Sequence, residues 1–207
     1  MKGEKRRVVI STFFEGFAIK HIIPKLSPDK IIIALDDLKS SEEKKEKMKE
    51  TLKSLKDFFK DAIEIETFRI SSYDIPKIMM EINNKIEEES KKGSEILIHI
   101  TEGRKTTSLA VLFSAYLKKD LIEGAYYITE EDKELIKLPL LKFEISGTKK
   151  KMLSLINKGV TDINKIMSEL NIKQSATYKN INELKAEGYL KKEDSLILTD
   201  LGKIMVV

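Results

Sequence analysis

Two segments of the sequence combine hydroxyl, basic and glycine residues in a pattern that suits an anion. The clearer one, residues 101–107, directly follows the apolar segment 96–100. A strand that turns at a glycine into a helix gathers unpaired backbone N–H groups and the positive end of a helix dipole at one spot. Two neighbouring cations make such a spot suited to phosphate. An ordinary turn with two solvated cations would look the same in sequence. The candidate ligand residues are Thr101, Glu102, Gly103, Arg104, Lys105, Thr106 and Thr107.

A second segment of the same kind lies near the N-terminus, after a predicted strand over residues 7–12. Its glycine, Gly16, precedes a predicted helix over residues 18–26. Both segments follow a strand and lead into a helix, and this repetition favours a binding role over an ordinary turn. The candidate ligand residues here are Thr12, Phe13, Phe14, Glu15, Gly16 and Phe17.

The elements that must position both segments alternate along the chain. Apolar or alternating runs predict strands, and the amphipathic segments between them predict helices. Strands are expected at 7–12, 30–35, 63–68 and 96–101, and helices at 18–26, 40–60, 75–92 and from 104. Four such units, followed by a hairpin over residues 124–138, predict an α/β fold with a Rossmann-like, open, mainly parallel sheet. Ligands of such sheets bind beyond the carboxyl ends of the strands, where both segments lie.

The pattern changes near Ile145, which divides the chain into two expected domains. Residues 1–140 would form the Rossmann-like domain, 141–146 a linker and 147–207 a second domain. In the second domain, three helices and two short strands predict a winged helix-turn-helix. Winged helices also serve as protein-interaction modules, and this alternative stays open. The residues expected to contact DNA are Lys173, Gln174, Ser175, Thr177, Tyr178, Lys179 and Asn180 in the third helix, with Lys191 and Lys192 in the wing.

The charge distribution agrees with a nucleic-acid role for the second domain. Residues 1–145 contain 27 Lys and Arg and 27 Asp and Glu, whereas residues 146–207 contain 11 and 7, so the net charge of +4 lies there. A modest basic excess permits DNA binding without requiring it. The chain has no Cys, which excludes disulfides, thiolate zinc sites and a cysteine nucleophile. No apolar run is long enough to span a membrane and no signal peptide is recognisable, so we expect a cytoplasmic protein with no membrane partner.

The combination of two loop motifs with an appended winged helix resembles the CRISPR-associated CARF transcription regulators of archaea. The motifs correspond to residues 12–17 and 101–107. In that family the second motif usually carries a Gly-Gly pair before its basic residue, and Glu102 replaces the first of these glycines. The resemblance covers residues 1 to about 140 as the CARF domain, for ligand sensing and dimerisation, and residues 146–207 as the winged helix.

The resemblance implies a homodimer whose two CARF domains form one symmetric pocket for a cyclic oligoadenylate, most often cyclic tetra-adenylate. An isologous dimer supplies each loop twice, as a two-fold ring of phosphates requires. Arg104 and Lys105 would meet phosphates, and the three phenylalanines would offer apolar walls to adenines, with at least one of them in the core. Ligand binding would change the arrangement of the winged helices and thereby their affinity for double-stranded DNA. No metal or other cofactor is expected.

Three other functions fit parts of the sequence. The first is a ring nuclease that cleaves cyclic oligoadenylate without a metal. There Lys105 or Arg104 would stabilise charge, and Ser11, Thr12 or His99 would orient the ribose hydroxyl. Against this, His99 lies in an apolar strand, as a core residue does. The second is a dinucleotide-binding regulator, although residues 12–17 lack the pattern G-x-G-x-x-G. The third is a constitutive DNA-binding protein whose sensor domain binds no ligand.

Overall fold

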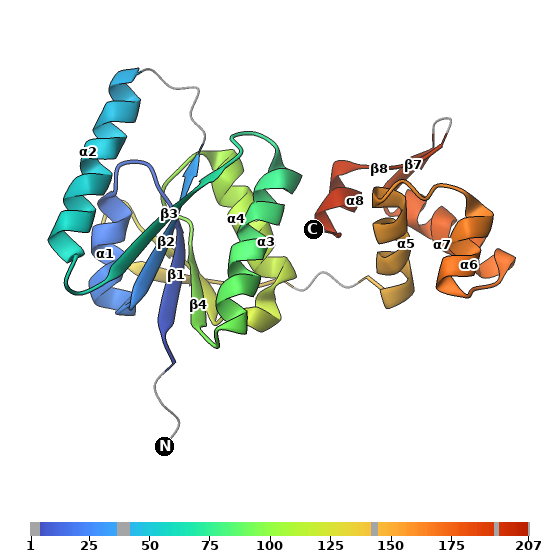
Figure 1. Cartoon of the computed structure of the whole chain (residues 1–207), viewed down its shortest axis with the longest axis horizontal. Helices are drawn as coiled ribbons and strands as arrows, with labels where there is room; N and C mark the ends of the chain where they lie inside the picture. The colour runs from blue at the N-terminus through green and yellow to red at the C-terminus, as the bar shows by residue number, and fades with distance from the viewer. Residues whose placement is uncertain (1–4, 37–41, 142–144, 193–194, 207) are drawn as a thin grey trace. The chain divides into compact units, whose positions relative to one another are not determined.

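The computed structural model describes residues 5–36, 42–141, 145–192 and 195–206. The chain divides into two compact units, residues 1–142 and 143–207 (Figure 1). Residues 142–144 of the predicted linker and residues 193–194 of the predicted wing lie outside the described residues.

Strands and helices alternate through the first unit until its last two strands. The four predicted strand–helix units are confirmed. The fourth helix begins one residue later than expected, because Arg104 keeps an extended backbone and serves as its N-cap. The elements are β1 (Arg7–Thr12), α1 (Phe17–Leu26), β2 (Lys30–Asp36), α2 (Glu42–Phe59), β3 (Glu64–Ile70), α3 (Ile75–Lys91), β4 (Glu95–His99), α4 (Lys105–Leu117), the short 3-10 helix η1 (Lys119–Leu121), β5 (Gly124–Ile128) and β6 (Leu135–Leu138).

The six strands form one sheet in the order β3-β2-β1-β4-β5-β6. Neighbouring strands are parallel except β5 and β6, which form the predicted antiparallel hairpin. β2 and β3 extend the sheet on one side of β1, whereas β4, β5 and β6 extend it on the other. The chain therefore reverses its direction of winding between β1 and β4. This is the Rossmann-like, mainly parallel sheet that the sequence predicts.

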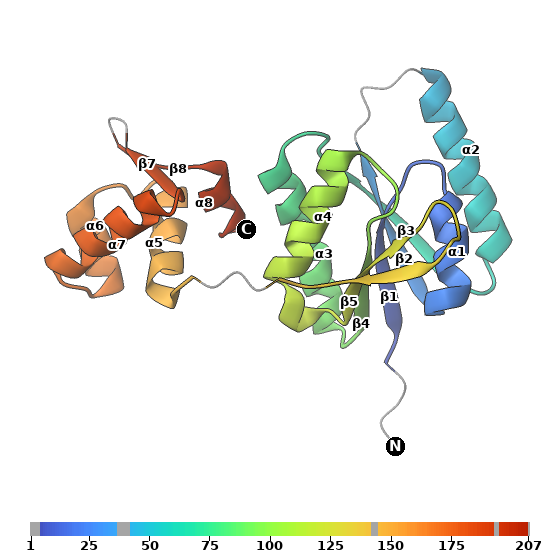
Figure 2. The same cartoon turned by 180° about the vertical axis from the view of Figure 1, so that it is seen from behind.

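Helices cover both faces of the sheet. α1 and α2 lie against one face and α3 and α4 against the other, as Figures 1 and 2 show from opposite sides. Because both faces are covered, the three isoleucines at 31–33 in β2 are all fully buried. Ile31 and Ile33 share a core cluster with Ile19 and Ile22 of α1. This two-sided core holds in place the strand ends from which the two predicted ligand loops leave.

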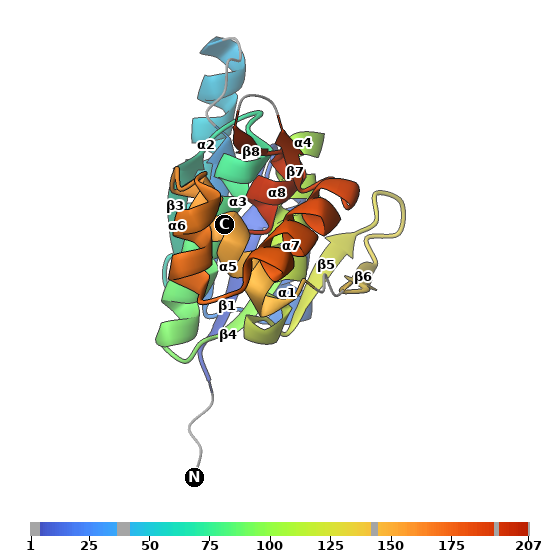
Figure 3. The same ribbon diagram turned by 90° about the vertical axis from the view of Figure 1, so that its right-hand side faces the viewer.

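The second unit consists of three helices, a pair of short antiparallel strands and a final short helix (Figure 3). Helices and strands occur in the order that the sequence predicts. The turn before the third helix is closed by Asn171, whose φ of 49° is the left-handed conformation that ends the preceding helix. Apolar side chains of all three helices are buried in a common core, including Leu153, Ile166 and Leu184. The elements are α5 (Gly147–Asn157), α6 (Ile163–Leu170), α7 (Gln174–Ala186), β7 (Leu190–Lys192), β8 (Leu196–Leu198) and α8 (Asp200–Ile204).

Candidate ligand-binding site

The two predicted ligand loops meet at the carboxyl edge of the sheet. β1 and β4 are hydrogen-bonded neighbours, so the loops that follow Thr12 and His99 leave the sheet side by side. A hollow of about 300 Å³ opens between these loops. This edge is the point where the winding reverses, which is where open α/β sheets bind their ligands. The hollow is lined by Phe14, Glu15, Phe17, Thr101, Glu102, Gly103 and Glu130.

Glu102 joins the two loops through its carboxylate. Its Oε2 accepts hydrogen bonds from the backbone N–H groups of Phe14 (3.0 Å) and Gly16 (2.9 Å), and its Oε1 accepts one from Ala18 (2.8 Å). A negative charge is stabilised there because Ala18 lies in the first turn of α1. Glu102 was expected to contact a ligand, but its carboxylate is bound to the chain itself.

Gly103 allows this close approach of the two loops. Its φ of +96° is a conformation that side chains rarely adopt, and a Cβ at this position would lie 3.2 Å from the Cβ of Thr12. The backbone conformation therefore favours glycine at this position, and the space next to Thr12 is tight for any side chain.

Arg104, at the start of α4, is already paired within the chain. Its Nε lies 3.1 Å from Oδ2 of Asp36, whose side chain is only 6% exposed. Its Nη1 donates to the hydroxyl of Tyr73 (2.7 Å), and its guanidinium lies 5.2 Å from the centre of that ring. Arg104 was expected to be available to a phosphate, and the structure instead gives it two internal partners. A polar residue directly after the apolar run of β2 is the sequence signal that would have pointed to Asp36.

Lys105, unlike Arg104, is available to a ligand. It is exposed, it occupies the first turn of α4, and it makes no ion pair within the described part of the chain. The next two residues are less accessible. Thr106 donates to the backbone oxygen of Ser72 (3.1 Å), and the buried Thr107 donates to Oδ2 of Asp36 (3.2 Å). Thr107 supports the Asp36–Arg104 pair and cannot reach a ligand.

The phenylalanines of the first loop divide between core and hollow. Phe13 is only 3% exposed and packs in the core cluster beneath α1 and α2, so its ring cannot form a wall for a ligand. Phe14 is 44% exposed and Phe17 is half-buried, and both line the hollow. Thr12 is completely buried, so its hydroxyl is likewise out of reach.

His99 is a buried residue with both ring nitrogens in use. The hydroxyl of Ser11 donates to the backbone oxygen of Thr12 (2.8 Å), so its oxygen accepts from Nδ1 of His99 (2.8 Å). Nε2 then accepts from the hydroxyl of Thr101 (2.7 Å). Burial lowers the pKa of His99 from its ordinary value of 6.5 to about 3, so the ring is neutral. Neither Ser11 nor His99 can orient a ribose hydroxyl of a ligand, because both are fully buried.

The residues expected to contact DNA lie at the start of α7 and in β7, and most of those at α7 are exposed. Thr177 is fully buried and donates to the backbone oxygen of Lys173 (3.1 Å), so it holds the helix and cannot touch DNA. Asn180 is half-buried, and Lys191 and Lys192 lie in β7. Among the residues at the start of α7, those exposed are Lys173, Gln174, Ser175, Tyr178 and Lys179.

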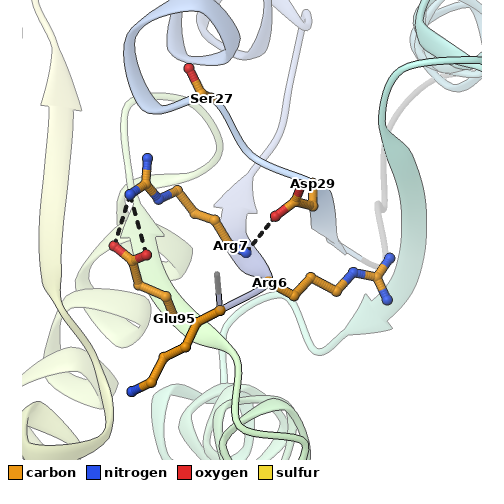
Figure 4. A pocket seen from close by; sticks show the side chains of 6 residues that line it. Arg6, Arg7, Ser27, Asp29 and Glu95 are labelled. Carbon is orange, nitrogen blue, oxygen red and sulfur yellow. Dashed lines mark hydrogen bonds and ion pairs between the residues drawn. The ribbon is translucent and has the colours of Figure 1, made fainter. Parts of the chain in front are cut away.

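A further hollow, of about 700 Å³, lies at the opposite, amino edge of the sheet (Figure 4). Both of its arginines are paired. Arg7 makes two hydrogen bonds to Glu95 (3.1 and 3.2 Å) and one to the backbone oxygen of Leu26 (2.8 Å), while Arg6 is bonded to Glu64. These contacts hold the amino ends of neighbouring strands together, and they leave no unpaired arginine to receive an anion.

Two other kinds of site are absent from the described residues. No group of three or more His, Asp or Glu side chains there is arranged to hold a metal ion. None of the helices in the described part is both long and apolar enough to cross a lipid bilayer.

Comparison with solved structures shows the fold. The chain is similar to Enterococcus italicus Csm6 bound to cyclic hexa-2'-fluoro-hexa-dAMP, with a TM-score of 0.56 and 11% identity, over 87% of this chain and 54% of that one. It is also similar to protein VC1899 from Vibrio cholerae, with a TM-score of 0.52 and 11% identity, over 96% of this chain and 63% of that one. The chain thus spans less than two thirds of either relative.

Comparison of sequences identifies the family. No curated protein matches the chain. Residues 7–139 match the model of the Csa3 CRISPR-associated Rossmann-like domain, and this segment contains all six strands and both ligand loops. The chain therefore belongs to the family that carries this CRISPR-associated Rossmann-like (CARF) domain.

Proposed function

We propose that this protein is a transcription regulator that binds a cyclic oligoadenylate across a homodimer and binds DNA through its second unit. The observation that carries the proposal is the combination, at the β1–β4 edge, of an exposed cation at a helix N-terminus with an exposed phenyl ring beside a hollow. Lys105 would meet phosphate, and Phe14 would meet an adenine base.

The size of the hollow supports a site shared by two copies. About 300 Å³ is at the lower limit of sites that enclose a small ligand, whereas a ring of several nucleotides is much larger. An isologous dimer would bring two such hollows and two Lys105 side chains to one ligand. The structural relative Csm6 is bound to a cyclic hexanucleotide analogue, which supports this class of ligand. For this chain we propose cyclic tetra-adenylate, the ring that the resemblance to CARF regulators implies, and a dimer would share its four nucleotides equally.

Apolar residues on the outer side of α4 support the dimer. Leu109 is 46% exposed, and Leu112, Phe113 and Tyr116 follow it at helical spacing with half-buried side chains. Met80 of α3 adds another exposed apolar side chain, at 45%. α4 begins at Lys105, so a dimer that covers this helix would hold both phosphate-binding lysines close to its interface.

We propose that the second unit is a winged helix-turn-helix in which α7 is the recognition helix and the β7–β8 pair is the wing. α6 and α7 are joined by a three-residue turn, and α7 exposes most of the polar side chains of its first two turns. Lys173, Gln174, Ser175, Tyr178 and Lys179 are suited to phosphates and base edges. Lys191 and Lys192 on the wing would contact flanking phosphates. A ligand that favours one arrangement of the dimer would change the affinity for DNA.

Titration calorimetry with cyclic tri-, tetra- and hexa-adenylate tests the sensor, with light scattering to give the molar mass. We expect one cyclic tetra-adenylate for two chains and a different DNA affinity with and without it. Binding of no ring size would contradict the proposal, and DNA affinity that no ring changes would favour a constitutive DNA-binding protein. Analysis of the incubated ligand for linear product decides the ring-nuclease alternative, which the burial of Ser11, Thr12 and His99 disfavours.

A further inference from the structure

The loop after β1 has the backbone geometry of an anion-binding site. The N–H groups of Phe14, Gly16 and Ala18 converge on one place, directly at the start of α1. Gly16 is the N-cap in the left-handed conformation (φ 73°), and as a glycine it has no side chain with which to cap the helix. Convergent N–H groups at a helix start receive phosphate or carboxylate groups in many proteins.

In this chain the place is already filled from the other loop. The carboxylate of Glu102 accepts all three hydrogen bonds, at 2.8 to 3.0 Å, across more than 80 residues of sequence. On its other side, the backbone oxygen of Glu102 accepts a hydrogen bond from Ser108 in the first turn of α4 (3.2 Å). Glu102 thus connects the start of α1 to the start of α4.

We propose that Glu102 is a positioning residue whose carboxylate takes the place of an external anion in the loop after β1. Two consequences follow for the proposed ligand site. The amides of this loop are not available to a ligand phosphate, so phosphate recognition falls on Lys105 and the start of α4. Because Glu102 holds the N–H of Phe14, it also holds the exposed ring of Phe14 at the hollow, where a base would stack. Both consequences rest on the proposed function, whereas the place of the Glu102 carboxylate among the three N–H groups does not.

Replacement of the internal anion by an added one tests the proposal. Glu102→Ala leaves three donors without their acceptor, and we expect a Tm lower by roughly 5 °C. Acetate offers a free carboxylate of the same kind, so sodium acetate should raise the Tm of the variant, whereas sodium chloride at equal ionic strength should not. Inorganic phosphate should act as acetate does. The wild-type Tm should not respond to acetate, because its own carboxylate fills the place.

Two further variants control the experiment. Glu15→Ala removes an exposed carboxylate from the same loop. Glu15 makes only a loose ion pair with Lys47 (3.5 Å), so the Tm of this variant should show no acetate-dependent rise. Glu102→Gln keeps the size of the side chain but removes its charge, and we expect its Tm to fall less than that of Glu102→Ala. It serves as the test variant if Glu102→Ala does not fold. Hydrogen exchange should be faster at residues 14–18 in both Glu102 variants. An acetate effect equal in all variants, or unchanged exchange at these residues, would overturn the proposal.

Ligand binding separates this proposal from the proposed function. We expect Glu102→Ala to bind cyclic tetra-adenylate about tenfold more weakly, with acetate restoring part of the loss. A Lys105→Ala variant should show no such restoration, because acetate cannot replace a cation. If no ring size binds to the wild type while acetate still stabilises Glu102→Ala, the proposed function fails and the role of Glu102 stands. If the rings bind to the wild type but acetate does not selectively stabilise Glu102→Ala, the proposed function stands and the role of Glu102 fails.

Discussion

Asp36 Oδ2 lies 3.1 Å from Nε of Arg104, and this pair decides which cation at the ligand edge is available. Asp36 ends β2 and Arg104 precedes α4, so the pair joins two elements on either side of β1. Thr107 and Tyr73 add hydrogen bonds to its two members. A phosphate that approaches Arg104 therefore meets a cation whose charge is already partly neutralised.

Asp36→Asn should weaken the fold and strengthen ligand binding. Loss of the ion pair should cost about 1–2 kcal/mol of unfolding free energy, since Arg104 is 30% exposed and solvent screens part of the interaction. Removal of a negative charge next to Arg104 should tighten binding of cyclic tetra-adenylate up to about tenfold. Denaturant unfolding and calorimetry measure the two effects. Asp120→Asn, in the exposed η1 segment, is the matched control and should change neither.

Lys105→Ala should reduce ligand affinity with little change in stability. The side chain is exposed and makes no ion pair within the described residues, so its removal disturbs no internal contact. In a dimer the substitution removes two lysine–phosphate interactions, which corresponds to roughly a hundredfold weaker binding of cyclic tetra-adenylate. Lys91→Ala is the control. Lys91 is an exposed lysine at the end of α3, where the chain enters β4 at the amino edge, opposite the proposed ligand site. Equal affinity of the two variants in calorimetry would place the phosphate elsewhere.

Lys173→Ala and Lys179→Ala should weaken DNA binding and flatten its dependence on salt. Removal of one lysine–phosphate interaction should reduce the slope of log K against log salt by about 1. Lys151→Ala, an exposed lysine of α5, provides the comparison and should keep the wild-type slope. These slopes come from fluorescence anisotropy at several salt concentrations. A wild-type slope in both α7 variants would mean that α7 is not the recognition helix.

His99 should make the protein sensitive to mild acid. Its pKa is about 3 in the folded chain and about 6.5 when unfolded, because burial disfavours the charged ring. The unfolded chain therefore binds a proton at a higher pH than the folded chain, and stability is lost as the pH falls from 6.5 towards 3. His99→Gln cannot be protonated, so its Tm should fall less between pH 6.5 and 5 than that of the wild type. His21→Gln is the control. The ring of His21 is only half-buried, against Phe17, so the Tm of this variant should change with pH as that of the wild type does.

The sequence by itself determined the architecture of the first unit. The continuous apolar run at residues 31–33 indicates a strand covered on both faces, and four strands with intervening helices permit few arrangements. Parallel strands place their carboxyl ends at one edge, so the sequence predicts that the loops after Thr12 and Thr101 both lie there. The strand in fact ends at His99, and the strand order makes the two loops neighbours.

Only the tertiary structure decided which of the predicted residues face a ligand. Phe13 and Phe14 are neighbours of the same type, yet one is 3% exposed and the other 44%, because the loop turns between them. Arg104 and Lys105 are adjacent cations, yet Asp36, 68 positions away in sequence, pairs with the first alone. Glu102 accepts three hydrogen bonds from backbone N–H groups only because the loop after β1 folds against it. Such pairings depend on distances between residues far apart in the chain, and periodicity and spacing report only on neighbours.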